Sequence, residues 1–274
     1  MILDSHVHVW VQQPEAYPWQ PIGGYVPENE APAEMLLSEM DAAGVDGAVL
    51  VQPTPYGWDN SYLLDAASRY PERFRTVCLV DALDKAGPQN LHRLVGEHQI
   101  AGIRINWHIQ PVHVWQENTH HRALWAVASK LGVPVCLQLT PDYLDFLGEA
   151  AEQYGIPVVI DHLGRPAVGA QPNDAGFSDL LDLAAHKNVH VKLSGLNYYS
   201  GEGAPYRDVW PLIRAVVERF GAQRCMWGSD FPFVQDHWSY GGLLSTIRKD
   251  WQLEPGQLEW VLGGTARRLW WRSL

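Results

Sequence analysis

The first strand-like stretch of the chain reads Ile2-Leu-Asp-Ser-His6-Val-His8-Val-Trp10, and a stretch near the other end reads Cys225-Met-Trp-Gly-Ser-Asp230-Phe231. Side chains alternate along an extended strand, so His6 and His8 point to the same face. We expect these stretches to be the first and last strands of one closed barrel. Two imidazoles and a carboxylate would then meet in one pocket, as a hydrolytic site requires.

Six more apolar, β-branched runs lie between these two stretches. The eight predicted strands cover residues 2–9, 46–53, 74–81, 100–106, 133–140, 156–163, 189–195 and 225–231. Helix-like segments alternate with them at Ala33–Ala43, Ser61–Tyr70, Pro88–His98, His121–Leu131, Tyr143–Tyr154, Phe177–His186 and Tyr206–Phe220, with a final pair near 240–250 and 255–271. Eight such units favour a (β/α)8 TIM barrel over an open sheet. We expect one α/β domain over residues 1–274.

Glycines mark several of the predicted boundaries between a helix and the next strand. Gly44, Gly132 and Gly155 each stand between a helical segment and an apolar run. Glycine adopts the left-handed conformation that ends many helices, so this repeated spacing supports the predicted units. Irregular segments such as 107–119 and 164–176 follow the strands instead, and they are expected to build a pocket at the C-terminal rim of the barrel.

Composition excludes several classes of function. The chain has 274 residues, 46% of them apolar, with 20 Lys and Arg against 31 Asp and Glu, which gives a net charge of −11. Because no basic cluster is present, neither nucleic acid nor an anionic membrane surface is an expected partner. We expect no secretory signal and no membrane span. Cys78, Cys136 and Cys225 lie far apart in apolar runs, which is typical of reduced core cysteines in a cytoplasmic protein.

The predicted strands are apolar inside and polar where they end. Seven of the eight strand ends carry polar side chains: His6, His8, Gln52, Arg104, Asn106, Gln138, Thr140, His162, Lys192, Ser194 and Asp230. Polar residues gathered at one end of the strands are what an active-site rim requires. Trp10 is one of four tryptophans in the rim loops, where an aromatic face can stack on a flat or sugar-like ring.

Each of these residues also has a structural interpretation. His162 precedes a sharp turn and can serve packing alone. Asp230 can cap the turn that follows it, because Ser-Asp before a chain break is common capping chemistry. Lys192 can form an ion pair inside the barrel. The alternatives stay open for the single residues, whereas the combination of His6, His8 and Asp230 favours a functional site.

Four motifs give the chain a resemblance to a known family. They are Asp4-Ser-His6-Val-His8-Val-Trp10, Val159-Ile-Asp-His162-Leu-Gly-Arg-Pro166, Val191-Lys192-Leu-Ser-Gly-Leu196 and Met226-Trp-Gly-Ser-Asp230-Phe-Pro232. Together they resemble the amidohydrolase superfamily, of the amidohydrolase-2 type. The branch they are most similar to holds sugar lactonases of the fuconolactonase and rhamnonolactonase kind and 2-pyrone-4,6-dicarboxylate lactonase. The resemblance covers essentially the whole chain and implies a TIM-barrel hydrolase, a lactonase of carbohydrate or aromatic catabolism.

The resemblance leaves two expectations open for a metal cofactor. Metal-dependent members of the superfamily carry a histidine at the end of strand five, where this chain has Gln138. At most one ion is therefore expected. One hypothesis is a single divalent cation, Zn²⁺ in the first place, bound by His6, His8 and Asp230 with water in the open position. The other is a site without metal, as in the pyrone lactonase of this branch.

Opening of a lactone ring requires an activated water and stabilisation of an oxyanion. We expect Asp230 to be the base, while His6, His8 and His162 polarise the carbonyl directly or through a cation. The predicted substrate-binding residues are Arg104, Asn106, Gln138, Lys192, Trp10 and Arg165, with Arg104 and Arg165 suited to clamp a carboxylate. Tyr198 and Tyr199 are further candidates for contacts with substrate.

Two other functions remain as alternatives to a lactonase. Neighbouring branches of the superfamily contain metal-dependent decarboxylases of unsaturated or aromatic acids, although the missing strand-five histidine weighs against that chemistry. A barrel that only binds a small acid is the second alternative, but such a protein needs no general base. The expected partner is a small molecule in every case. The choice of lactone and the formation of a homo-oligomer both stay open at this point.

Overall fold

A computed structural model describes residues 1–271 and contains one eight-stranded parallel sheet in the order β1 to β8. The strands are β1 Leu3–Val7, β2 Gly47–Val51, β3 Phe74–Leu79, β4 Gly102–Asn106, β5 Val135–Gln138, β6 Val158–Ile160, β7 Val189–Leu193 and β8 Cys225–Trp227. Residues just beyond β1 and β8 close the seam. The His8 amide donates to the Phe231 carbonyl over 2.7 Å, and the Asp230 amide donates to the His6 carbonyl over 2.9 Å. The result is a nearly closed barrel, and the predicted TIM-barrel fold is confirmed.

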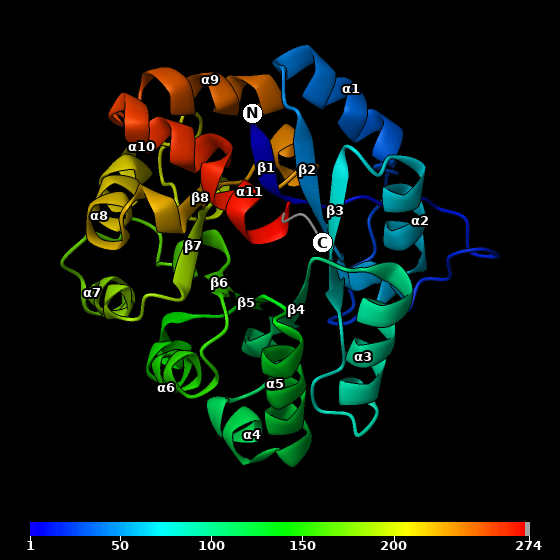
Figure 1. Ribbon diagram of the computed structural model, residues 1–274. Coiled ribbons are helices and arrows are strands. Elements are labelled where there is room, and N and C mark those ends of the chain that lie inside the picture. The colour runs from blue at the N-terminus through cyan, green and yellow to red at the C-terminus, as the bar shows by residue number, and fades with distance from the viewer. Residues whose placement is uncertain (272–274) are drawn as a thin grey trace.

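Helices surround this barrel on the outside (Figure 1). They are α1 Ala33–Ala43, α2 Ser61–Arg69, α3 Gly87–His98, α4 Val112–Glu117, α5 Thr119–Leu131, α6 Leu144–Tyr154, α7 Ala175–Asp182, α8 Trp210–Phe220, α9 Tyr240–Lys249, α10 Pro255–Glu259 and α11 Thr265–Trp270. A π-helical turn, Trp260–Gly264, joins α10 to α11. The predicted glycine boundaries are confirmed, because Gly44, Gly132 and Gly155 end α1, α5 and α6 in the left-handed conformation.

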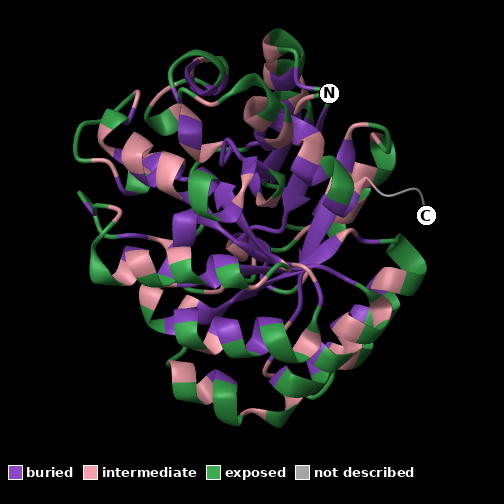
Figure 2. Cartoon of the chain, turned by 60° about the vertical axis from the view of Figure 1, so that its left-hand side comes forward, coloured by how far each residue is buried: buried purple, intermediate pink, exposed green. Residues whose placement is uncertain are grey.

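Two apolar layers hold the barrel together. The larger layer lies between the strands and the surrounding helices, and the strands are almost entirely buried while the helices alternate between buried and exposed faces (Figure 2). A smaller cluster includes Leu3, Val77 and Met226 from the strands together with Leu269 and Trp270 of α11. Helix α11 therefore closes one end of the barrel, and the loops that follow the strands lie at the other end. Cys78, Cys136 and Cys225 are buried and unpaired, as predicted.

The structure differs from the predicted elements at a few boundaries. Helix α4 occupies part of segment 107–119, which was expected to be irregular. Helix α5 begins at Thr119, two residues earlier than predicted, because the Asn118 side chain accepts hydrogen bonds from the His120 and His121 amides. Strand β8 ends at Trp227, so Asp230 lies in the loop after the strand rather than on it.

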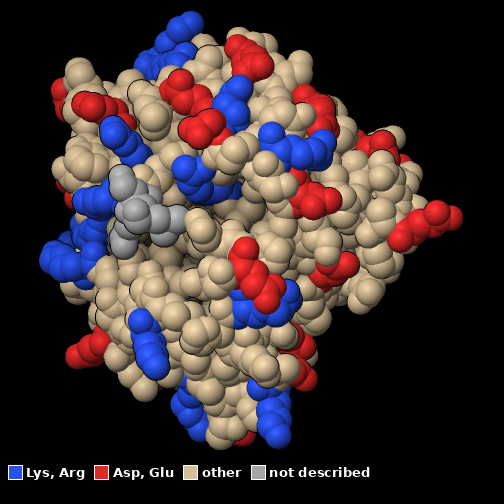
Figure 3. Space-filling model, turned by 45° about the vertical axis from the view of Figure 1, so that its right-hand side comes forward, with Lys and Arg blue, Asp and Glu red and all other residues tan. Residues whose placement is uncertain are grey.

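Charges of both signs are interspersed on the face shown in Figure 3. No helix among the described residues is both long enough and apolar enough to cross a membrane.

Candidate active site

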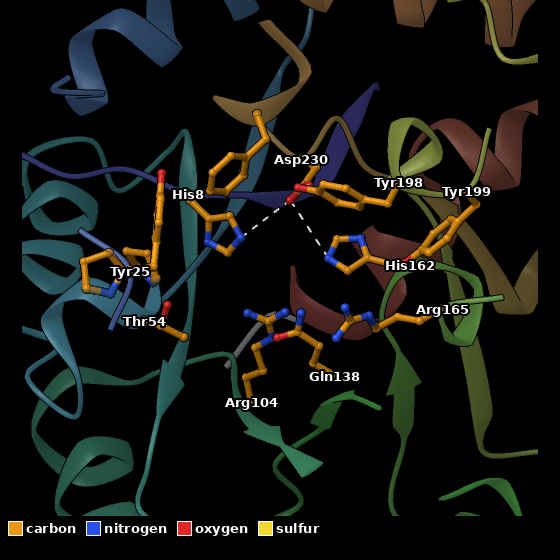
Figure 4. Close-up of a pocket in the computed structure, with 13 residues that line it drawn as sticks. His8, Tyr25, Thr54, Arg104, Gln138, His162, Arg165, Tyr198, Tyr199 and Asp230 are labelled. Atoms are coloured by element: carbon orange, nitrogen blue, oxygen red, sulfur yellow. Dashed lines mark hydrogen bonds and ion pairs between the residues drawn. The ribbon is translucent and has the colours of Figure 1, made fainter. Parts of the chain in front are cut away.

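Four side chains from three strand ends converge on the axis of the barrel. His6 lies near the end of β1 and His8 just after it, His162 follows β6, and Asp230 follows β8. One carboxylate oxygen of Asp230, Oδ1, lies 3.6 Å from Nε2 of His6, 3.6 Å from Nε2 of His8 and 4.0 Å from Nε2 of His162. Figure 4 shows His8 and His162 turned toward this carboxylate from two sides. The convergence of His6 and Asp230 that the sequence predicted is confirmed.

The backbone is strained at two of these positions. Asp230 has φ of 60° and His162 has φ of 53°, both in the left-handed region that non-glycine residues rarely occupy. Such a conformation costs roughly 1–2 kcal/mol per residue. The surrounding structure holds Asp230 there through its own amide and through the Phe231 amide, which donates to Ser229 Oγ over 3.0 Å. Strained backbone at strand ends commonly serves to aim functional side chains.

The Asp230 carboxyl has the properties of a general base. Burial raises its pKa to about 7, and the hydrogen bond that Tyr198 donates to Oδ2 over 2.8 Å counteracts part of that rise. Its other oxygen, Oδ1, is buried and accepts no hydrogen bond from the residues that the structure describes. A carboxyl with a pKa near neutrality and one free oxygen is suited to take a proton from water.

The histidines around Asp230 are neutral near pH 7. Burial lowers the pKa of His8 and of His162 to about 3, and it lowers the pKa of His6 well below 6.5. Each ring also has a fixed partner on its far side. His8 Nδ1 lies 2.8 Å from the Val51 carbonyl, and His162 Nδ1 lies 2.9 Å from Ser194 Oγ. Neutral imidazoles with unprotonated nitrogens are suited both to hydrogen bonding and to metal ligation.

A buried ionic network lies beside His6. Asp161 accepts a hydrogen bond from Arg104 Nε over 2.8 Å, and its Oδ1 lies 3.0 Å from Lys192 Nζ. Burial by itself raises the pKa of Asp161. The neighbouring positive charges, Lys192 first, outweigh the effect of burial, so the pKa of Asp161 lies well below 3.8. Lys192 Nζ also lies 3.0 Å from His6 Nδ1. Asp161 was not among the predicted site residues, although two basic residues on barrel strands require a buried acid to balance their charge.

A cavity of about 200 Å³ opens above these groups. Figure 4 shows Asp230 on one side of it and Arg104, Gln138 and Arg165 on the other. Long loops supply the remaining walls: Tyr25, Pro53, Thr54, Pro55, Tyr198, Tyr199 and Phe233. Tyr25 and the residues of segment 53–55 were not predicted, because the sequence contains no signal for how a long loop folds over a rim.

The structure brings six of the predicted site residues to the wall of this cavity: His8, Arg104, Gln138, His162, Arg165 and Asp230. His6 lies directly behind them and is completely buried. Three predicted substrate-binding residues do not line the cavity. Lys192 is completely buried against His6 and Asp161, Asn106 is buried, and Trp10 packs behind Phe233 with its indole donating to the Asn29 carbonyl over 2.7 Å. A role in substrate binding stays a prediction for these three residues.

The same centre contains side chains of the kinds that hold a metal ion. Ligand atoms of His6, His162 and Asp230 all lie within 4.8 Å of one another. Tetrahedral donors bound to zinc lie about 3.3 Å apart, which is close to the 3.6 Å and 4.0 Å that separate the two imidazoles from Asp230 Oδ1. The spacing alone, with Oδ1 free, therefore admits one divalent cation, and ligation by His6 further requires that its Nε2 carry no proton. The predicted set differed by including His8 instead of His162.

Comparison with known proteins places this geometry among hydrolases. The sequence profile of the amidohydrolase family matches residues 3–272. An L-fucono-1,5-lactonase from Burkholderia ambifaria is 30% identical over 96% of this chain and 93% of its own length. A 2-pyrone-4,6-dicarboxylate hydrolase from Comamonas testosteroni is 31% identical over 88% and 81%. The crystal structure of an amidohydrolase from Burkholderia multivorans with bound zinc shares the fold, with a TM-score of 0.83 and 24% identity over 98% of both chains.

Proposed function

The chain belongs to the amidohydrolase family, and we propose that it hydrolyses a small lactone that carries an anionic group. Relatives that act on lactones support the first half of this proposal. The observation that carries the second half is the arrangement across the cavity. Asp230, with a pKa of about 7, faces two guanidinium groups, those of Arg104 and Arg165. A cavity of about 200 Å³ suits a single substituted ring.

Asp230 performs the proton transfers in this proposal. A water molecule donates a hydrogen bond to Oδ1, and Asp230 takes its proton as the water oxygen bonds to the carbonyl carbon of the lactone. The tetrahedral intermediate then breaks the ring C–O bond. Asp230 returns the proton to the departing alkoxide, so the product is an open-chain hydroxy acid and the enzyme is restored.

The oxyanion of that intermediate requires hydrogen-bond donors on the cavity wall. When Ser194 Oγ donates to His162 Nδ1, the proton of His162 is on Nε2, which faces Asp230. His162 is therefore our proposed donor to the lactone carbonyl. If a single divalent ion, Zn²⁺ in the first place, were held by His6, His162 and Asp230, it would polarise the same carbonyl as a Lewis acid.

Arg104 and Arg165 would bind the anionic group of the substrate. Arg104 is anchored through Nε to Asp161, which leaves its terminal nitrogens for the cavity. Arg165 reaches the cavity from the turn after His162, with the Tyr199 hydroxyl beside it. Planar guanidinium groups bind carboxylates and similar anions through paired hydrogen bonds. The three unpaired cysteines agree with a cytoplasmic location, which is part of the proposal.

A panel of three substrates tests this function. The panel contains a six-membered lactone with a carboxylate, a neutral sugar lactone of the same ring size, and a dihydroxybenzoate. We expect acid release from both lactones, with kcat/KM for the anionic one higher by about tenfold or more, as one charged hydrogen-bonded contact provides. Release of CO2 from the benzoate without lactone opening would identify a decarboxylase instead. Binding without turnover of any compound would identify a binding protein.

A further inference from the structure

Lys192 is a buried lysine whose ammonium group contacts a ring nitrogen of His6. It lies on β7 with no exposed surface, and its Nζ is 3.0 Å from His6 Nδ1. An ammonium group donates hydrogen bonds and has no lone pair with which to accept one. The Nδ1 atom of His6 must therefore be the acceptor, and the proton of the neutral His6 ring must be on Nε2.

The position of the proton on the neighbouring His8 ring is also fixed, in this case by an acceptor. His8 Nδ1 lies 2.8 Å from the Val51 carbonyl, which only accepts hydrogen bonds. The proton of His8 is therefore on Nδ1, and its Nε2 is an acceptor. His6 Nε2 and His8 Nε2 lie 3.1 Å apart, a contact that needs one proton, and His6 supplies it. All three hydrogen bonds thus run in one direction, from Lys192 through His6 and His8 to Val51.

This direction conflicts with metal ligation by His6. A metal ion at His6, His162 and Asp230 needs the lone pair of His6 Nε2, so the proton of His6 would have to move to Nδ1. Asp161 Oδ1, 3.4 Å away, is able to accept from Nδ1. Lys192 nevertheless points a donor at the same atom, and two donors would then face each other.

Lys192 has little room to withdraw. Its Nζ lies between His6 and Asp161, and the Trp270 ring lies 5.4 Å from it. Asp161 is shared with Arg104, so this side of His6 carries two cationic groups for one carboxylate. Positive charge in excess beside His6 further opposes a divalent cation.

We propose that Lys192 is a positioning residue that keeps the proton of His6 on Nε2, so that His6 serves as a hydrogen-bond donor in the centre of the site and not as a metal ligand. Lys192 acts through His6 and His8 and does not contact substrate. The proposal concerns the state of His6 and does not rest on which substrate the enzyme opens. The site binds a metal ion through His6 only when the hydrogen bond from Lys192 to His6 Nδ1 is removed.

The first test reads the tautomer of His6 directly. The full-length protein is labelled with ¹⁵N at histidine, and two-bond ¹H–¹⁵N spectra are recorded without metal near pH 7.5. His6→Gln identifies the signals of His6 by their disappearance. We expect a protonated Nε2 and an unprotonated Nδ1. A protonated Nδ1 in the unaltered protein would overturn the proposal, and this result needs no variant at Lys192.

The second test measures binding of Zn²⁺ alone, by competition with a chromophoric chelator. Lys192→Met removes the ammonium group and keeps an unbranched apolar side chain, and Lys187→Met at an exposed position is the control for lost charge. We expect Lys192→Met to bind Zn²⁺ at least about tenfold more tightly than the unaltered protein, because the proton of His6 can then move to Nδ1 and a positive charge beside the ion is gone. A tenfold change is the smallest effect that partners of metal ligands usually have on metal affinity. Lys187→Met should match the unaltered protein. The His6 signals of Lys192→Met should shift to the form protonated at Nδ1. Equal or weaker Zn²⁺ binding by a folded Lys192→Met would contradict the proposal, and if that variant does not fold the spectrum of the unaltered protein decides.

Discussion

Asp230 stands in a left-handed turn with one carboxylate oxygen bonded to Tyr198 and the other facing three imidazoles. Its residue type and its proximity to His6 were predictable from the sequence, because both follow from the ends of strands one and eight. The hydrogen bond from Tyr198 was not predictable, since it depends on how the loop after β7 folds back over the cavity.

Tyr198→Phe should move the pH dependence of catalysis. The carboxylate form of Asp230 is the active one, so kcat/KM of the unaltered enzyme should fall as pH drops through about 7. Tyr198 donates to the charged form and so lowers the pKa of Asp230. Without the hydroxyl that pKa rises, and the acid limb of the kcat/KM profile should move to higher pH by about one unit. Tyr199→Phe is the control, and an unmoved limb in Tyr198→Phe would contradict this role.

Arg165→Met should change substrate preference rather than the chemical step. The substitution removes a guanidinium group from the cavity wall but leaves Asp230 and the histidines in place. We expect KM for a lactone with a carboxylate to rise by about tenfold or more, with KM for a neutral lactone nearly unchanged. Arg248→Met, which removes an exposed arginine of α9, should affect neither value. An equal rise of KM for both substrates would assign Arg165 a structural role.

At the scale of elements, the apolar runs and the glycine boundaries were sufficient to predict all eight strands and most helices. Both signals are local, because strand runs reflect burial on two faces and glycine reflects left-handed backbone. Helix α4 was not predictable, since six residues carry too little periodicity to distinguish a helix from a loop. The short extent of β8 also depends on the barrel seam, which forms between residues more than two hundred positions apart.

His121 links the loop after β4 to helix α5 through an aromatic cluster. Its Nε2 lies 3.1 Å from Trp107 Nε1 and 2.9 Å from Trp125 Nε1, and all three side chains are buried. His121→Phe keeps an aromatic ring but leaves two buried indole N–H groups without an acceptor. We expect a loss of about 2–4 kcal/mol in the free energy of unfolding, measured by urea titration. His113→Phe, at an exposed position of α4, is the matched control, and equal stability of the two variants would contradict this role.

At the scale of the whole molecule, the arrangement of charge inside the barrel was the part least accessible from sequence. The pattern predicted that polar groups gather at one end, and the cavity contains six of the predicted residues. It did not separate the residues that reach the cavity from those beneath it. His6 and Lys192 are completely buried, whereas His8, His162 and Arg104 line the cavity. How far each side chain lies from the cavity is defined only once the barrel is packed.

Buried histidines should make the folded protein sensitive to acid. Burial lowers the pKa values of six of them: His6, His8, His108, His121, His162 and His190. Below about pH 6.5 these histidines bind protons in the unfolded chain but stay unprotonated in the folded protein. The free energy of unfolding therefore falls as pH decreases. Asp4 and Asp230 act in the opposite direction, since their raised pKa values of about 6 and about 7 favour the folded state in acid. Six groups against two give a net loss of stability.

Urea unfolding at pH 7 and pH 5 measures this effect. We expect the free energy of unfolding to be lower at pH 5 by at least about 3 kcal/mol, which corresponds to a net uptake of protons on unfolding. An equal m-value, the slope of the free energy of unfolding against urea concentration, would show that the same transition is compared at both pH values. Equal or greater stability at pH 5 would mean that the buried histidines are protonated in the folded state.

The most direct test of the proposed hydrolysis is single-turnover opening of an anionic lactone by Asp230→Asn. The amide keeps the size of the carboxyl group but accepts no proton from water. We expect the rate of ring opening to fall by about 10²–10⁴-fold while the product acid still binds. Asp179→Asn, at an exposed position of α7, should retain full activity. Ring opening by Asp230→Asn at close to the unaltered rate would show that another group takes the proton from water, and it would contradict the assignment of Asp230 as the base.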